Sequence, residues 1–355
     1  METVPVSGAA PLGVTGGKLV AAGDDLGLYL VGGWNPGFVD GSSNGDNSYV
    51  RDVWKFSFFQ KKWTRLFCGL DDAGAPLSMA SHSCHFLPHD SLLIARLLPG
   101  TDEENDDEDD GDHWGNLPYA MDVPVKRSIF CLDLHQKVWR HLSDIPYPDS
   151  RRQLPMFRDK IVLYQNCLYV FAGCVSGGMD LYARNFPAEC AQDLANPYCL
   201  NLQTMVWTRI QHRSLASPPS LACYALSQRD HFVYLSGGIL NGTQGVVSTA
   251  VWRFDLATHE WQLLCEGEEG GLQRWFHDTA VADGCLYSFG GAVNRHYSSR
   301  DVRPSNLSRM RVRPQTLASA AMDSIATHFG QALSKLSDEE LRQVFPERFV
   351  QMVLF

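Results

Sequence analysis

The sequence has few of the features that mark secreted, membrane or zinc-binding proteins. Its ten cysteines are scattered without a C-x-x-C pair, and Cys167 and Cys285 occupy the same place in matching phrases. We interpret them as reduced core thiols rather than disulfides or zinc ligands. No basic region leads into an apolar stretch at the start of the chain, and no later apolar run could cross a bilayer. We therefore expect a cytoplasmic or nuclear protein, or one found in both compartments, with no membrane partner.

Catalytic motifs are also missing. The twelve histidines are spread across the chain, and neither a metal-ligand spacing nor a nucleophile motif rises above chance. We expect a protein that is not an enzyme and needs no cofactor or metal.

Negative charge is concentrated in one short segment. The formal net charge is −10, and residues 102–112 hold nine acidic residues and no basic one, so the rest of the chain sums to −10 + 9 = −1. This composition predicts a disordered, solvated loop at about 100–124, and a docking element for a basic partner is the alternative. The balance argues against nucleic-acid binding.

Tryptophans recur at a fixed distance from a preceding aromatic residue. Four times a tryptophan follows an aromatic residue by nine positions, which suits two antiparallel strands joined by a tight connection. We interpret these tryptophans as core residues, with a ligand platform as the alternative. The pairs are Trp54 and Trp63, Phe130 and Trp139, Tyr198 and Trp207, and Trp252 and Trp261.

Each pair closes a longer phrase, in which an apolar strand ends in glycine or another small residue. Glycine suits this place because it tolerates positive φ and allows backbones to approach closely. Five phrases begin near residues 18, 78, 155, 219 and 274, and the pitch of roughly 50 residues resembles that of kelch β-propeller blades. We therefore expect an all-β kelch propeller over 1–313 with five recognisable repeats, in five or six blades. The fifth repeat lacks its tryptophan, so we expect a strand near Thr3–Val6 to complete it.

The pattern changes after residue 313. Leu317, Ala321 and Ile325 fall on one face of a predicted helix over Gln315–Leu333. A capping box at Ser337–Glu340 predicts a second helix through Phe345, and Pro346 leads into a third. Residues 314–355 are thus expected to form a helical tail.

Two motifs in this tail, at the end of a kelch propeller, resemble those of kelch substrate receptors of cullin-2 ubiquitin ligases. Thr316, Leu317, Ala321 and Ile325 are similar to an elongin-binding box, although its usual cysteine is alanine here. Phe345, Pro346 and Phe349 are similar to the box that selects cullin-2. The resemblance implies a non-catalytic subunit that binds elongin B, elongin C and cullin-2 through these residues. A kelch scaffold whose tail only caps the propeller is the alternative.

The resemblance also implies capture of substrate proteins by their C-termini in the central pocket, and it extends to restraint of a serine/threonine phosphatase. A terminal carboxylate needs forked arginine donors, hydroxyl groups and an aromatic wall. The family has six repeats, whereas five are recognisable here, and the fourth lacks the family's arginine pair before Tyr224. Each arginine could instead be solvated or paired with a loop carboxylate. The candidate pocket residues are Arg274, His277, Arg151, Arg152, Arg158, Tyr224 and His82.

Overall fold

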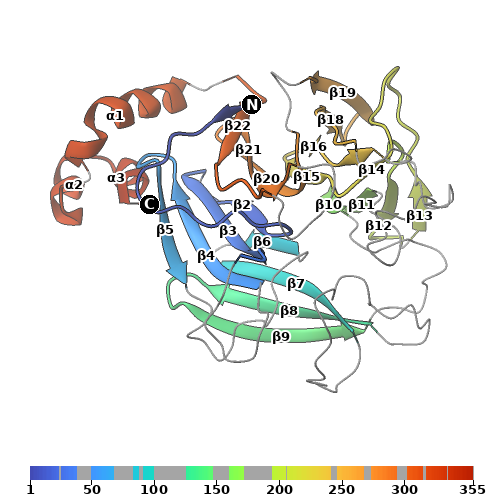
Figure 1. Ribbon diagram of the computed structural model, residues 1–355, viewed down its shortest axis with the longest axis horizontal. Coiled ribbons are helices and arrows are strands. Elements are labelled where there is room, and N and C mark those ends of the chain that lie inside the picture. The colour runs from blue at the N-terminus through green and yellow to red at the C-terminus, as the bar shows by residue number, and fades with distance from the viewer. Residues whose placement is uncertain are drawn as a thin grey trace.

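The computed structural model describes most of the chain, which folds into β-sheets and a group of helices at its C-terminal end (Figure 1). The described residues are 1–23, 25–37, 49–67, 83–87, 91–99, 125–146, 160–171, 194–204, 206–240, 246–267, 273–293, 302–314, 317–333 and 335–354. The predicted acidic loop at 100–124 lies outside them.

The described residues form five four-stranded antiparallel sheets, one for each phrase in the sequence. Blade 1 comprises β2 (Lys18–Ala21), β3 (Gly27–Trp34), β4 (Tyr49–Ser57) and β5 (Lys62–Phe67). Blade 2 comprises β6 (Ser83–Leu87), β7 (Ser91–Pro99), β8 (Val125–Asp133) and β9 (Val138–Pro146). Blade 3 comprises β10 (Lys160–Tyr164), β11 (Cys167–Phe171), β12 (Tyr198–Asn201) and β13 (Val206–Arg209). The expected propeller is confirmed, and the described residues form five blades.

Blades 4 and 5 follow the same plan with additions. Blade 4 comprises β15 (Ala225–Arg229), β16 (Phe232–Ser236), β18 (Val251–Asp255) and β19 (Glu260–Cys265), beside the short pair β14 (Leu221–Ala222) and β17 (Ile239–Leu240). Blade 5 comprises β20 (Trp275–Ala282), β21 (Cys285–Ala292), β22 (Ser308–Arg311) and β1 (Glu2–Thr3). The first strand of each phrase lies nearest the centre of the molecule, and the last strand lies at the outside (Figure 1).

Both ends of the propeller sequence contribute to blade 5. β1 pairs antiparallel with β22, with Glu2 opposite Arg309, and the Val4 N–H donates to the Leu307 carbonyl at 2.8 Å. Closure by the N-terminal segment is therefore confirmed, at Glu2–Thr3 rather than Thr3–Val6. Pairing covers the edge that β22 would otherwise expose.

The tryptophans pack between neighbouring blades. Trp63 of blade 1 contacts Phe289 of blade 5 at a ring-centroid distance of 5.7 Å, and Trp261 of blade 4 contacts Phe171 of blade 3 at 6.0 Å. Trp139 of blade 2 belongs to a buried cluster that includes Val31 of blade 1. The interpretation as core is confirmed for these three residues, while the side chain of Trp207 lies outside the described ones.

Register explains the nine-residue spacing. The tryptophan does not face the first aromatic residue of its pair: Trp63 lies opposite Phe56, and Trp54 lies opposite Arg65. The guanidinium of Arg65 lies 5.9 Å from the Trp54 ring, and that of Arg209 lies 5.7 Å from the ring of Tyr198. In blades 1 and 3 the first aromatic residue thus contacts a cation on the outermost strand, whereas in blade 4 Trp252 lies opposite Leu263.

The diglycines allow neighbouring blades to hydrogen-bond through their backbones. The N–H of Gly238 donates to the carbonyl of Arg274, and that of Gly291 donates to the carbonyl of Val14, both at 2.8 Å. A Cβ on Gly290 would lie 2.2 Å from the Val14 carbonyl oxygen, and one on Gly291 would lie 2.7 Å from the Trp275 carbonyl oxygen. Only glycine fits these two positions.

Three helices form the C-terminal tail. These are α1 (Leu317–Leu333), α2 (Asp338–Val344) and α3 (Glu347–Leu354). The capping box is confirmed, because Ser337 and Glu340 exchange side-chain and backbone hydrogen bonds. The first helix is described only from Leu317, since residues 315–316 lie outside the described residues.

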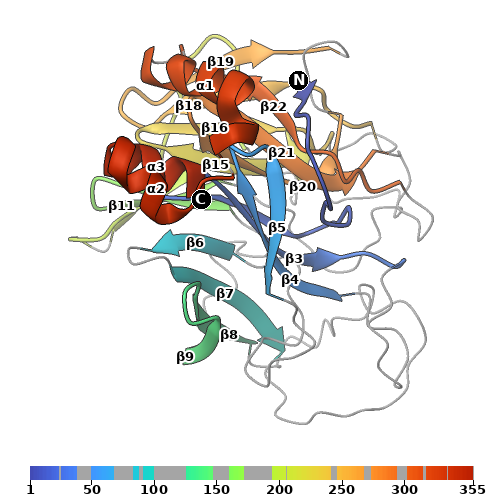
Figure 2. The same ribbon diagram turned by 90° about the vertical axis from the view of Figure 1, so that its left-hand side faces the viewer.

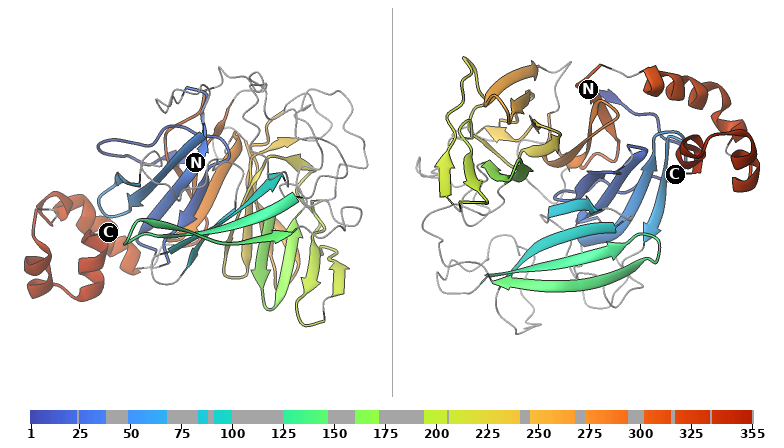
Figure 3. Two further views of the ribbon diagram at one scale, coloured as in Figure 1. Left: turned by 90° about the horizontal axis from the view of Figure 1, so that it is seen from below. Right: turned by 180° about the vertical axis from the view of Figure 1, so that it is seen from behind.

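The tail packs against the β4–β5 turn of blade 1, beside the sheets rather than over the centre of the ring (Figures 2 and 3). Phe59 in this turn joins a buried cluster with Leu333, Leu341, Val350 and Val353 of the tail. The next two residues of the turn add polar contacts: Gln60 donates to the Val353 carbonyl at 2.9 Å, and Lys61 lies 3.5 Å from Asp323. One turn of blade 1 therefore anchors all three helices.

Replacing Gly291 by alanine tests the close approach at the diglycine. Strain at φ +80° and overlap with the Trp275 backbone should together lower the free energy of unfolding by about 3 kcal/mol. Gly267→Ala is the matched control, since φ is +98° but no atom lies within 4 Å, so about 1 kcal/mol is expected. Chemical unfolding of both variants measures the difference, and equal losses would contradict the packing account.

Candidate protein-binding surfaces

Arg274 lies at the start of β20, where the sequence predicts a carboxylate clamp. Its side chain is buried, and the guanidinium donates to the Gly290 carbonyl at 3.3 Å, to Asn306 Oδ1 at 2.9 Å and to Ser308 Oγ at 3.3 Å. These contacts tie the start of β20 to the end of β21 and to β22. Burial lowers the pKa of Arg274 to about 10. All three acceptors are neutral, so the charge is held without a carboxylate from the blade.

His277 and Tyr224 are buried as well. His277 Nε2 lies 3.1 Å from Ser236 Oγ, which links blade 5 to blade 4. Tyr224 packs in the apolar cluster shared by blades 3 and 4. Arg274, His277 and Tyr224 are thus all buried, and their contacts within the propeller hold the blades together. Their part in binding a substrate stays a prediction.

The remaining pocket candidates lie outside the described residues. They are His82, Arg151, Arg152 and Arg158.

The local backbone conformation explains why Tyr224 and His277 turn inward. Gly16 and Cys223 stand just before the innermost strands of blades 1 and 4, Phe276 is the second residue of the innermost strand of blade 5, and each of the three has φ between 53° and 66°. The N–H of Phe276 donates to the Cys223 carbonyl, and the N–H of Gly16 donates to the Phe276 carbonyl. These residues with positive φ are thus joined by backbone hydrogen bonds from blade to blade. The same conformation at Cys223 and Phe276 directs the side chains of Tyr224 and His277 into the core.

β20 carries polar links to both of its neighbours, which the sequence reading missed. Asp278 accepts from Lys18 Nζ at 3.0 Å and from the Leu19 N–H at 2.9 Å, both in β2 of blade 1. On the opposite face, Thr279 Oγ1 donates to Ser227 Oγ at 3.2 Å in β15 of blade 4. Alternation of side chains along a strand produces this two-sided arrangement. The centre of the described ring is therefore polar and internally paired at these positions.

The helical tail presents one face to solvent. Leu317 is 88% exposed and Phe329 is 61% exposed, and Ala321 between them is also exposed. Ile325 is half-buried, because it packs against the cluster around Phe59. Three of these four residues form an accessible apolar row on α1. Thr316, the first residue of the predicted elongin-binding box, lies outside the described residues.

The residues of the predicted cullin-selecting motif divide between the core and the surface of the tail. Phe345 and Phe349 are half-buried and stack on each other with ring centroids 4.5 Å apart. Phe349 also meets Phe59 edge to face at 6.2 Å. Pro346 and Val344 are exposed. The aromatic residues of this motif thus stabilise the tail, whereas the exposed pair remains accessible.

The structure also bears on metal sites, membrane-spanning helices and cysteines. Within the described residues no group of three His, Cys, Asp or Glu could hold a metal ion. Within the same residues no helix is long and apolar enough to span a membrane. Cys285 is buried and free, and Cys167 is half-buried and free; burial raises the pKa of the Cys285 thiol.

Comparison with known proteins agrees with this architecture. The family model for the KLHDC2/KLHL20/DRC7 Kelch-repeats domain matches residues 122–291. The matched segment runs from β8 to β21 of the propeller, and this part of the chain is similar to kelch repeats. Kelch propellers are in general non-catalytic modules for protein interaction.

Similar proteins extend the match beyond that segment. Kelch domain-containing protein 10 of Rattus norvegicus is 25% identical over 324 residues, which cover 78% of this chain and 71% of that protein. The Homo sapiens protein of the same name is 24% identical and is covered over 66% of its length. The leucine-zipper-like transcriptional regulator 1 homolog of Drosophila melanogaster is 20% identical over 311 residues, covering 75% of this chain and 29% of that protein. This chain is thus similar to parts of longer proteins.

Substitution of Arg274 tests its structural use. Arg274→Ala removes the donor to Asn306 Oδ1 and one of the two donors to Ser308 Oγ, so the free energy of unfolding should fall by about 1–3 kcal/mol. Hydrogen exchange in β22 should accelerate. Arg140→Ala, at an exposed arginine of blade 2, should change stability by less than about 0.5 kcal/mol. If the free energy of unfolding of Arg274→Ala is unchanged, the structural role of Arg274 is wrong and ligand binding is the role that remains.

Substitution of Phe59 tests the anchor of the tail. Phe59→Ala removes a buried ring from the cluster, so docking of the tail should weaken by about 3–5 kcal/mol. Hydrogen exchange in α2 and α3 should accelerate, while the strands of blades 3 and 4 keep their protection. Lys61→Ala is the control in the same turn, and an exposed ion pair of 3.5 Å should contribute at most about 1 kcal/mol. Slow exchange in the helices of Phe59→Ala would mean that the tail holds itself together.

Proposed function

We propose that this kelch protein is the substrate-recognition subunit of a cullin-2 ubiquitin ligase that contains elongin B and elongin C. The observation that carries the proposal is the exposure of Leu317, which remains 88% accessible although the tail is anchored to blade 1 through the cluster around Phe59. An apolar side chain held outward on a fixed helix is suited to insertion into a partner's pocket.

The arrangement of the tail favours a receptor over the alternative of a scaffold with a self-capping tail. A capping helix would bury its apolar row on the propeller, whereas Leu317, Ala321 and Phe329 face solvent. The face that does meet the propeller uses Ile325 and Met322 instead. In the proposed complex Leu317 is the anchor in elongin C, Ala321 allows close contact, and Pro346 with the adjoining exposed residues faces cullin-2.

The propeller would supply the substrate-binding half of the receptor. We propose that it binds protein C-termini on the face where the diglycines and the starts of the innermost strands meet. Arg274 supports this face by fixing β22, and we propose that Arg151, Arg152 and Arg158 donate to the terminal carboxylate. Ubiquitin transfer would belong to other subunits, so the chemistry of this chain is capture and positioning.

Co-expression with elongins B and C tests the proposal directly. The intact chain should co-purify with both proteins, and Leu317→Asp should reduce the yield of the complex at least about tenfold, since an unpaired carboxylate in an apolar pocket costs several kcal/mol. Leu215→Asp is the matched control, because Leu215 is fully exposed on the propeller and lies outside the tail. Failure of the intact chain to bind the elongins rejects the ligase assignment. Equal loss with both variants would indicate a general defect.

A further inference from the structure

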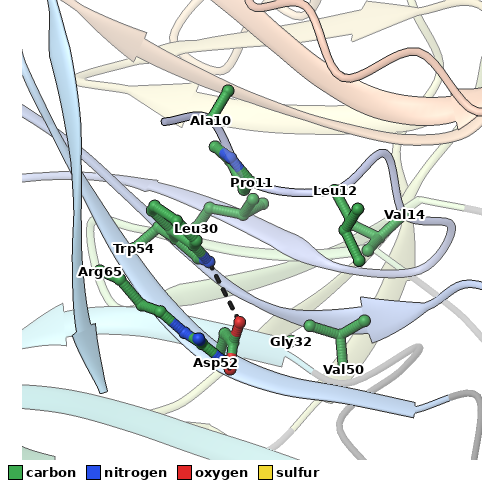
Figure 4. Close-up of a pocket in the computed structure, with 10 residues that line it drawn as sticks. All are labelled: Ala10, Pro11, Leu12, Val14, Leu30, Gly32, Val50, Asp52, Trp54 and Arg65. Atoms are coloured by element: carbon green, nitrogen blue, oxygen red, sulfur yellow. Dashed lines mark hydrogen bonds and ion pairs between the residues drawn. The ribbon is translucent and has the colours of Figure 1, made fainter. Parts of the chain in front are cut away.

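A cavity lies in blade 1 beneath the segment that leads from β1 to β2. Its volume is about 160 Å³. Figure 4 shows Ala10, Pro11, Leu12 and Val14 of this segment on one side and the residues of blade 1 on the other. The blade contributes Leu30 and Gly32 from β3, Val50, Asp52 and Trp54 from β4, and Arg65 from β5.

The size and lining of the cavity suit a small ring or branched chain. An apolar protein cavity of about 150 Å³ binds benzene. Here proline, leucine and valine side chains supply most of the wall, and the Trp54 indole supplies an aromatic surface.

One end of the cavity is polar, because a buried carboxylate lies there. Asp52 is only 8% exposed and lines the cavity. Its Oδ1 accepts from Arg65 at 2.6 Å and its Oδ2 accepts from Trp54 Nε1 at 3.3 Å. A carboxylate can accept about four hydrogen bonds, so each oxygen retains acceptor capacity. Arg65 is 41% exposed at its side chain, so solvent screens its charge more than that of Asp52. The polar end therefore favours a hydrogen-bond donor over an anion.

The segment that covers the cavity, residues 8–12, forms its roof and offers a path into it. Within the described part of the chain, residues 8–12 make no hydrogen bond, whereas Ser7 on one side and Gly13 with Thr15 on the other are fixed to blade 1. Leu12 is 49% exposed although its side chain lines the cavity. Residues 8–12 therefore form a short strap that is anchored at both ends. Such a segment can move away from the cavity without disturbing the ring of blades.

We infer that this cavity is a binding site for a small molecule with an aromatic or branched aliphatic body and a hydrogen-bond donor, best a protonated amine, that binds Asp52. The body lies between the strap and Trp54, and the donor meets the carboxylate beside Arg65. The site is separate from the tail and does not depend on the proposed ligase role.

Four probes of one shape test the inference on the full chain by ligand-observed NMR: benzylamine, benzyl alcohol, toluene and benzoate. Benzylamine should bind at least about tenfold more tightly than benzoate, because the buried carboxylate attracts an ammonium group and repels a carboxylate. Benzyl alcohol and toluene should fall between them. No binding by benzylamine, or equal binding by benzoate, overturns the inference.

Two variants locate the binding. Ala10→Phe places a ring in the roof and should lower benzylamine affinity at least about tenfold by filling the cavity, while Ala9→Phe, on the exposed neighbour that does not line it, should leave the affinity unchanged. Asp52→Asn should weaken benzylamine but not toluene. If Asp52→Asn fails to fold, the pair at positions 10 and 9 decides alone. Equal affinity for both alanine variants shows that benzylamine binds elsewhere and rejects the site.

Discussion

The structure depends on how closely two blades can approach at the ends of their second strands. The Gly238 and Gly291 N–H groups donate directly to the carbonyls of the next blade, and a Cβ on Gly290 would lie 2.2 Å from such a carbonyl. A side chain at these positions would separate the blades by the width of an atom. The tryptophans then fill the wider outer part of each interface, where Trp63 reaches Phe289 across the boundary. Narrow backbone contact inside and large rings outside together give each interface its wedge shape.

This constraint also explains why the last blade must be shared between distant parts of the chain. Blade 5 lies between blades 4 and 1, so both of its faces are committed to neighbours through His277 on one side and Asp278 on the other. An incomplete outer edge on such a blade would expose unpaired backbone groups. Pairing of Glu2–Thr3 with β22 covers part of that edge, and Arg274 fixes the start of β22 from inside. The N-terminal segment that returns from this edge crosses blade 1 and forms the roof of the cavity.

The sequence predicted the parts of the fold that follow from repetition and local chemistry. The spacing of the aromatic pairs predicted the outer hairpins, the diglycines predicted the blade boundaries, and the capping box at Ser337 predicted α2. It could not predict the roles of Arg274 and His277, because a charged residue at the start of a strand reads the same whether it faces solvent or turns inward. For His277 the direction is set by the left-handed backbone at Phe276, whose N–H donates to the Cys223 carbonyl of blade 4. For Arg274 it is set by acceptors on Asn306 and Ser308, which lie more than 30 positions away in the sequence. The roles of Asp278 and Phe59 could not be predicted for a similar reason, because their partners lie far away in the sequence. Asp278 pairs with Lys18, 260 positions away, and Phe59 packs against residues of the tail that are still farther away.

The attachment of the tail has a consequence for any partner that binds α1. Phe59 lies in the turn between β4 and β5, and these same strands contribute Trp54 and Arg65 to the cavity wall. Ser7, just before the strap, bonds to the Lys61 carbonyl in that turn, while the side chain of Lys61 pairs with Asp323 of α1. Strap, turn and tail therefore share one small region of blade 1, and a displacement of the turn must move all three. A partner held on the exposed row of α1 is consequently fixed in direction relative to the propeller, because the helix has its firm support on this single blade.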